Sequence, residues 1–289
     1  MSTKKSGEYR RYTRSKFGNF FYFLVLAAAG LFTLLPIIYM VATSFKPLDE
    51  LLIFPPRFFV NRPTFSNFIQ LPRLLSNLNV PLSRYLFNSL FVAIVVTLLQ
   101  MFFGSMCAFV LSKIKLRGVK IFFMITQFAL LYNSYTLAIP QYIVFIKLNM
   151  INTYWIYILP ALASSLTVFL LKQYIDDGIP DALLEAAKID GSNLFHCYLH
   201  IVLPNIKPAL MTVCLFGFQS IWSLQATGTI YDEVLKTLPS VLTQISEGGL
   251  ARAGSAMAAA VLMMIPTFIV YFVTQSNVLE TMSSAGMKD

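Results

Sequence analysis

The residues of this chain that could act on another molecule gather in one polar stretch between two strongly apolar segments. The stretch reads Glu185-Ala186-Ala187-Lys188-Ile189-Asp190-Gly191 and is followed by Ile201-Val202-Leu203-Pro204. The pattern predicts a helix, a glycine turn and a second helix that Pro204 closes. A short two-helix module between membrane spans is well suited to being gripped by a cytoplasmic partner, so the expected chemistry is noncovalent docking.

Several local signals support this two-helix interpretation. Pro180 and Asp181 suit a first helical turn, where a missing N–H costs nothing and a carboxylate meets the helix dipole. Gly191 can adopt the left-handed backbone that ends a helix, and Ser192 or Asn193 can cap the next one. The first helix is therefore expected to end at Gly191.

Other kinds of chemistry find little support. His196 and His200 lie four residues apart with Cys197 between them, but a zinc protease needs glutamate after the first histidine. No metal site is predicted. The chain has no Gly-x-Ser-x-Gly elbow and no Gly-x-x-x-x-Gly-Lys-Ser/Thr loop, so neither a hydrolase nor an ATPase is expected.

The composition is that of an integral membrane protein. Hydrophobic residues make up 57% of the chain and charged residues 12%, whereas a soluble domain carries about 25% charged residues. The net charge of +9 is explained by basic residues that flank membrane spans, so no nucleic-acid partner is predicted. The cysteines form no spaced framework that would indicate a disulfide or zinc; they are Cys107, Cys197 and Cys214.

Six segments are long and apolar enough to cross a bilayer as helices. They cover residues 19–44, 86–112, 120–143, 153–175, 207–229 and 254–275. Polar residues and prolines, Pro140 and Pro160, interrupt the third and fourth segments, which predicts kinks there or faces turned toward protein instead of lipid. The fold class is therefore all-α, embedded in membrane lipid.

Basic residues predict the orientation of these spans. Lys and Arg are frequent in residues 1–18 and in the loop 113–120, which places both segments in the cytoplasm. Both termini and the loop around Lys188 then lie inside, although basic residues in the external segment 45–85 weaken the rule there. No ionisable group falls at the centre of a predicted span, which disfavours a self-sufficient proton-coupled carrier.

Three regions follow from this layout. Residues 1–85 form the cytoplasmic N-terminus, the first span and an external loop of short helices and turns. Residues 86–275 form a five-span core that contains the docking loop 180–204, and residues 276–289 form a cytoplasmic tail.

The polar stretch resembles the EAA motif, the coupling-loop signature of permease subunits of bacterial ATP-driven importers. Glu185-Ala186-Ala187 is followed after three residues by Gly191, and Pro204 stands thirteen residues later within Ile-x-Leu-Pro. Asp190 and the run Lys207-Pro208-Ala209-Leu210 are similar to the carbohydrate branch of this family, of which the maltose-type permeases are the familiar example.

This resemblance implies the type I importer fold, with six transmembrane helices and a cytoplasmic coupling helix. The helix 181–189 would insert into a cleft of an ATP-hydrolysing subunit. The residues that couple to this subunit would be Glu185, Ala186, Ala187, Asp190, Gly191, Ile201, Leu203 and Pro204. The implied partners are a homologous second permease, two ATP-binding subunits and an external sugar-binding protein. ATP and Mg would bind to the partner subunits, with no cofactor in this chain.

Polar and aromatic residues inside the spans are candidates for the path of the substrate. Amides suit sugar hydroxyls, and aromatic rings stack on the C–H faces of a sugar. The candidates are Asn133, Phe218, Gln219, Trp222, Ser223 and Gln225. Hydrogen bonds between helices would explain any one polar residue equally well, and both interpretations stay open here.

The segment after Trp222 departs from many sugar permeases, which have Trp-Asn followed by an aromatic residue and Pro-Leu. Here Ser223 follows Trp222, and the stretch 228–239 reads GTIYDEVLKTLP. This stretch is similar to permeases for larger oligosaccharides from plant or host polysaccharides, some of which contain uronic acid.

The predicted function is that of an importer permease in a bacterial cell membrane, for a sugar and in particular an oligosaccharide. One alternative is a permease for a non-sugar solute, which a binding protein with a charged cleft would favour. Another is a stand-alone carrier or channel, which transport by the purified chain alone would support.

Overall fold

The structure is a computed structural model that describes residues 16–76, 80–115, 117–132, 134–225 and 228–286. Helices dominate these ranges, and no β-strand occurs in them. The long helices are α1 (Lys16–Ser44), α4 (Leu82–Lys113), α8 (Ser165–Gly178), α12 (Lys207–Trp222) and α14 (Ala253–Gly286). The shorter ones are α2 (Leu48–Leu51), α3 (Ser66–Ser76), α5 (Val119–Leu131), α6 (Ser134–Lys147), α7 (Trp155–Leu162), α9 (Asp181–Ile189) and α13 (Leu238–Ser246). The all-α fold class is confirmed.

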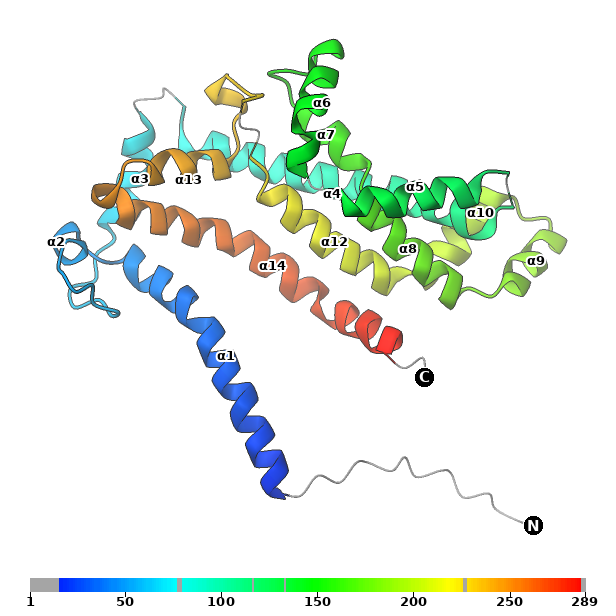
Figure 1. The fold of residues 1–289 in the computed structure, drawn as a ribbon, viewed down its shortest axis with the longest axis horizontal. Helices are drawn as coiled ribbons and strands as arrows, with labels where there is room; N and C mark the ends of the chain where they lie inside the picture. Colours follow the sequence, from blue (N-terminus) through cyan, green and yellow to red (C-terminus); the bar gives the residue numbers. More distant parts are fainter. Residues whose placement is uncertain (1–15, 77–79, 116, 133, 226–227, 287–289) are drawn as a thin grey trace.

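The long helices lie roughly along one axis of an elongated molecule. Helix α12 packs between α4 and α14, and α8 packs on α4. Figure 1 shows α2, α3 and α13 gathered at one end of this bundle, and α9 and α10 (Leu194–Cys197) at the other. We call these the α13 end and the α9 end. Helix α1 meets α14 at the α13 end and diverges from it toward the N-terminus (Figure 1).

Four apolar stretches of helix are long enough to cross a membrane by length and composition. They are Phe17–Ser44, Leu82–Lys113, Trp155–Gly178 and Ala253–Val278. They match the first, second, fourth and sixth predicted spans. In the fourth, the helix breaks at Ala163 and Ser164 rather than at Pro160, and Ser164 caps α8 by accepting the N–H of Thr167 at 3.3 Å.

The third and fifth predicted spans differ from single straight helices. The third is the pair α5 and α6, which meet at an angle of 115°. Extended backbone at Tyr132 ends α5, and Pro140 lies inside α6, so the helix breaks at Tyr132 and not at Pro140. The fifth, α12, has 16 residues and ends at Trp222 instead of near residue 229. At about 1.5 Å per residue α12 is shorter than the hydrocarbon core of about 30 Å. Counting each bent pair as one span brings the total to six among the described residues.

Buried polar side chains of α4 bind most of the elements around it. Asn88, Ser89, Gln100 and Ser105 are all buried. Toward the α13 end, Asn88 donates to the carbonyls of Val234 (2.8 Å) and Lys236 (2.9 Å), and Ser89 accepts the N–H of Leu238 (2.7 Å). In the middle of α4, Gln100 donates to Thr167 of α8 (2.9 Å). Toward the α9 end, the hydroxyls of Ser105 and Tyr198 form a hydrogen bond of 2.7 Å. Because unpaired polar groups are costly in an apolar interior, these bonds fix α4 against α8 and both ends of the molecule.

The predicted external segment 45–85 does contain short helices and turns. Buried Glu50 accepts the backbone N–H groups of Asn61 (3.1 Å) and Arg62 (2.9 Å), and buried Lys46 donates to the carbonyl of Arg57 at 2.5 Å. Two buried ions that are hydrogen-bonded to backbone thus hold the turn that follows α1.

The crossing of α4 and α8 generates a test. A Cβ added at Gly104 would lie 2.5 Å from the methyl carbon of Thr167. Thr167 is buried, and its hydroxyl accepts a hydrogen bond from Gln100, so its side chain cannot easily move aside. We expect Gly104→Ala to destabilise the chain by about 1–3 kcal/mol through overpacking, seen as a lower midpoint of thermal unfolding in detergent.

Two further variants control this prediction. Gly30→Ala should be neutral, because nothing lies within 4 Å of a Cβ added at Gly30. Adding Thr167→Ser to Gly104→Ala removes the obstructing methyl group and should restore part of the loss. A Gly104→Ala variant as stable as the parent would contradict the close packing described.

Candidate functional site

Helix α9 forms as the sequence predicts. Pro180 occupies the position before the helix with extended backbone, and Asp181 is its first residue. Leu184 and Ala187 are buried among the apolar residues of α4, α8 and α12. One apolar stripe therefore holds a short helix that would be marginal in isolation.

A glycine turn ends α9 at the predicted residue. Gly191 has φ of +84°, the left-handed region that favours glycine. The N–H of Gly191 bonds the carbonyl of Lys188 at 3.1 Å, and the N–H of Ser192 bonds the carbonyl of Ala187 at 3.0 Å. These two bonds form a Schellman motif, so the direction in which the chain leaves α9 is set by backbone hydrogen bonds.

The second helix of the module starts at a capped position. The side-chain oxygen of Asn193 accepts the N–H of His196 at 2.7 Å, so Asn193, and not Ser192, is the cap. After α10 comes a π-helical turn, Tyr198–Val202, and then α11 (Leu203–Asn205).

The prediction that Pro204 closes this helix is wrong. The helix runs through Pro204 and ends one residue later, at Asn205. The π-helical turn ends at Val202, two residues before the proline. The carbonyl four residues before Pro204 lies within this turn, and the wider ring of a π-helix relieves the clash between them. The side chain of Asn205 donates to the carbonyl of Ile201 at 2.7 Å and closes the last turn.

The predicted coupling residues differ in exposure. Glu185, Ala186, Asp190, Gly191 and Pro204 are exposed, Ile201 and Leu203 are half-buried, and Ala187 is buried. Ala187 thus packs on its own chain. The opposite side of α9 carries Ala182, Ala186 and Ile189 at helical spacing with Glu185 beside them, and Ile189 is 87% exposed. We call these four residues the α9 outer face.

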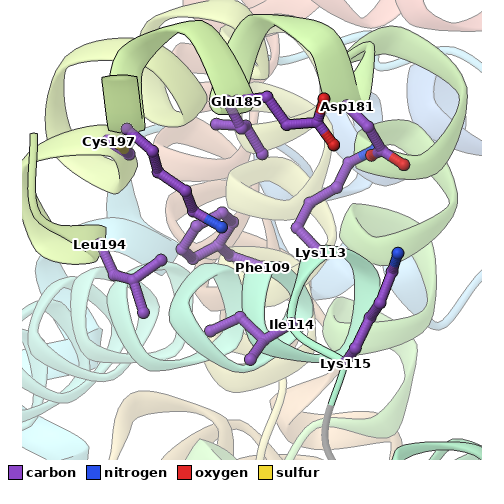
Figure 2. A pocket seen from close by; sticks show the side chains of 10 residues that line it. Phe109, Lys113, Ile114, Lys115, Asp181, Glu185, Leu194 and Cys197 are labelled. Atoms are coloured by element: carbon purple, nitrogen blue, oxygen red, sulfur yellow. The ribbon is translucent and has the colours of Figure 1, made fainter. Parts of the chain in front are cut away.

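A buried lysine ties α9 to α4. A hollow of about 250 Å³ lies between the last turn of α4, α9 and α10. Figure 2 shows Lys113 reaching across it toward Asp181. The Lys113 side chain is only 8% exposed, and its Nζ donates to the Ile179 carbonyl at 2.6 Å and to Asp181 Oδ1 at 2.8 Å. One cation therefore joins the end of α4 to the first turn of α9.

The charge state of Asp181 supports this contact at neutral pH. The hydrogen bond from Lys113, together with the charge of Lys113, lowers the pKa of the Asp181 carboxyl. A lowered folded-state pKa means that the contact is present above the ordinary aspartate pKa and is lost as pH falls through the lowered value.

The candidate path residues on α12 fall into two groups. Phe218 and Trp222 are buried and stack with ring centroids 5.7 Å apart, and the indole N–H of Trp222 donates to the Met263 carbonyl on α14 at 2.8 Å. These two rings join α12 to α14. Gln219, Ser223 and Gln225 are exposed, and Asn133 lies outside the described residues. A path role for the exposed three stays a prediction.

Sequence reasoning missed the residues that hold the loop to the bundle, above all Lys113, Ser105 and Tyr198. Lys113 stands in a basic run after a span, where solvent exposure is the ordinary expectation. Its only signal is the carboxylate at Asp181, the first residue of the predicted helix.

Among the described residues no group of three or more histidine, cysteine or acidic side chains could hold a metal ion. The rings of His196 and His200 stack on each other with centroids 4.0 Å apart.

Comparisons with known proteins found relatives along most of the chain. It is 30% identical to Protein LplC of Bacillus subtilis over 230 residues, which cover 77% of this chain and 74% of LplC. It is 29% identical to the polygalacturonan/rhamnogalacturonan transport system permease protein YtcP of the same organism, covering 86% of this chain and 90% of YtcP. No protein-family model matches the chain.

A solved structure shows the same fold. It is that of a bacterial ABC transporter involved in the import of the acidic polysaccharide alginate. The match has a TM-score of 0.76 at 22% identity and covers 92% of this chain and 99% of the matched chain.

The link between Lys113 and Asp181 predicts the mobility of α9. Lys113→Met removes the cation and leaves the Ile179 carbonyl and Asp181 without their donor, so we expect backbone hydrogen exchange across 181–189 to rise about tenfold. Lys147→Met, which removes an exposed lysine of α6 that does not line this hollow, is the matched control and should leave the exchange unchanged. Equal exchange in the two variants would show that the lysine does not hold α9.

Proposed function

This chain belongs to the permease subunits of ABC transporters for sugars and oligosaccharides, and on that premise we propose that it forms one half of the translocation path of an ATP-driven importer. The other half would be a homologous second permease. Two ATP-binding subunits with ATP and Mg would dock at the α9 end, and an external sugar-binding protein would dock at the α13 end. As such a permease subunit, the chain is embedded in a membrane.

The observation that carries the coupling proposal is the geometry of α9. It lies at one extremity of the molecule (Figure 1), presents the small and apolar α9 outer face, and leaves through a turn built from backbone hydrogen bonds. Lys113 and the buried pair Leu184 and Ala187 fix it to the bundle. A rigid, exposed helix of this kind passes a displacement to the spans instead of absorbing it.

We propose that closure of the ATPase subunits moves α9 and, through Lys113, the end of α4. Helix α4 carries this displacement toward the α13 end, because its buried polar groups are bonded to α8 and to the segment 234–238. The spans would thereby swing between inward- and outward-facing arrangements.

The second permease would cover the exposed polar side chains of α12. Gln219 and Ser220 are exposed near the end of α12, and Ser223 is exposed directly after it. Amides and hydroxyls that face hydrocarbon are costly, so a protein seam or a water-filled path between two permeases suits them. Six spans, both termini in the cytoplasm and a five-span core over 86–275 complete the proposed arrangement in a bacterial plasma membrane.

For the cargo we propose an oligosaccharide, and specifically a fragment that contains uronic acid. YtcP is named for polygalacturonan and rhamnogalacturonan transport, and the structural neighbour is involved in alginate import. Uptake of labelled oligogalacturonates by cells that express the full importer, compared with neutral oligosaccharides of the same length, tests this choice.

The α9 outer face yields a variant test. Ala186→Arg places a long cation where a close approach is required, without touching the buried face of α9. We expect the variant to reach the membrane in normal amounts, to lose the ATPase subunit on purification and to lose more than 90%, roughly, of sugar uptake.

Ser246→Arg is the matched control, because Ser246 is an equally exposed small residue at the α13 end. It should keep the ATPase subunit bound. Normal uptake by the Ala186→Arg variant would contradict the coupling role of α9.

The proposed assembly predicts the outcome of a purification. A mild-detergent pull-down of the chain should recover a second multi-span permease and an ATPase with a Gly-x-x-x-x-Gly-Lys-Ser/Thr loop, identified by mass spectrometry. Recovery of the chain alone, under conditions that hold other membrane complexes together, would instead support a stand-alone carrier.

A further inference from the structure

A second hollow lies at the α9 end and shares Ile114 and Lys115 with the hollow beneath α9. It has a volume of about 510 Å³ and lies where α4 ends, α5 begins and α8 passes beside them. Four cationic side chains line it: Lys115, Arg117, Lys120 and Lys172. The rest of its wall is mostly apolar and includes Val119 and Phe123.

Only one of these cations meets a carboxylate within ion-pair distance among the described residues. Lys172 Nζ lies 2.5 Å from Asp176 and 4.3 Å from the centre of the Phe123 ring. Asp176 also accepts a hydrogen bond from Ser112. Lys115, Arg117 and Lys120 are exposed, and the nearby Asp181 is held by Lys113. The hollow therefore has an excess of about three positive charges.

The position of the hollow is that of a membrane boundary. It adjoins the last turn of the apolar helix Leu82–Lys113, the final turns of the apolar stretch Trp155–Gly178 and the start of α5. From there α5 continues with exposed apolar side chains such as Ile121 and Ile125. Cations thus stand at one end of a largely apolar surface, in which Gln127 is an exposed polar residue.

This juxtaposition matches the two parts of an anionic lipid. A phosphate headgroup gains from several cations close to a low-dielectric surface, and an acyl chain gains from an apolar groove. An acidic segment of a partner protein would use the cations but leave the groove and the apolar side of α5 uncovered. The first turn of α5, which begins after Gly118, adds unpaired backbone N–H groups on the same side.

We propose that this hollow binds the phosphate headgroup of an anionic membrane lipid of the phosphatidylglycerol type, with an acyl chain lying along α5. The cations Lys115, Arg117 and Lys120 contact the phosphate, and Phe123 and Val119 contact the upper part of the chain. Lys172 keeps its ion pair with Asp176 and forms part of the wall of the hollow. The site requires only that the chain is embedded in a membrane, so it is independent of the coupling role of α9.

A lipid titration followed by native mass spectrometry tests the site. The full chain in detergent is titrated with phosphatidylglycerol or with phosphatidylcholine of the same acyl chains. We expect a preference for phosphatidylglycerol in the parent chain, and binding about tenfold weaker or more in Arg117→Gln/Lys120→Gln, since each cation near an anionic headgroup contributes roughly fivefold.

The control is Arg57→Gln/Lys147→Gln, which removes two exposed cations elsewhere and should bind as the parent does. Equal affinity for the two lipids, or an equal loss in variant and control, would overturn the site. Displacement of phosphatidylglycerol by millimolar inorganic phosphate would show a free-anion site and would also overturn the lipid assignment.

A photoactivatable phosphatidylglycerol provides a second measurement that needs no variant. Crosslinks in the parent chain should map to residues 117–125, and crosslinks that avoid this range would contradict the proposal. Loss of the crosslinks on addition of ATPase subunits would show that the surface serves a protein partner instead.

Discussion

The structure depends on the need to satisfy the polar side chains of α4 inside an apolar bundle. Asn88, Ser89, Gln100 and Ser105 are buried, and each makes a hydrogen bond to another element. In the described part of the chain, only the hydroxyl of Thr97 and the Oε1 atom of Gln100 are buried polar side-chain atoms of α4 without a partner. An unpaired amide or hydroxyl at these depths would cost more than a typical hydrogen bond contributes. Their partners lie on the 234–238 segment, on α8 and on the π-helical turn, so a single helix sets the relative positions of three otherwise separate parts.

The α4 contacts also join the two ends of the molecule. Near the α13 end, Glu233 accepts hydrogen bonds from Lys236 and Tyr85. Burial favours its neutral form, but these bonds outweigh burial and lower the pKa of its carboxyl. At the α9 end, Lys113 holds Asp181. Near each end of α4 a side chain of this helix thus binds a carboxylate of another segment: Tyr85 donates to Glu233, and Lys113 donates to Asp181.

The sequence predicted helices at all six span positions and the course of α9, because apolar length, Pro180 and Gly191 act locally. It did not predict the 115° angle between α5 and α6, which depends on the extended backbone at Tyr132 and not on Pro140. Nor did it predict that Ala187 faces inward, since the choice between two adjacent alanines is made by the packing of Leu184. From the sequence, Trp222 could equally have faced a substrate path. Its indole N–H instead donates to the carbonyl of Met263, 41 residues away, and this bond orients the side chain. Such long-range choices leave no periodic trace in a single sequence.

Helix α1 is much less buried by the rest of the chain than α4, which affects the substitutions that each helix can tolerate during evolution. Within the apolar window of α1 no residue is buried by the rest of the chain. Before its last turns, which pack on α14, α1 is not covered by the rest of this chain. Exchanging one apolar residue for another in that exposed part therefore leaves the fold of this chain nearly unchanged. Substitutions should therefore accumulate in α1 among related permeases, while the polar positions of α4 change only together with their partners. A comparison of substitution rates between these two helices would separate the positions selected for folding from those selected for assembly.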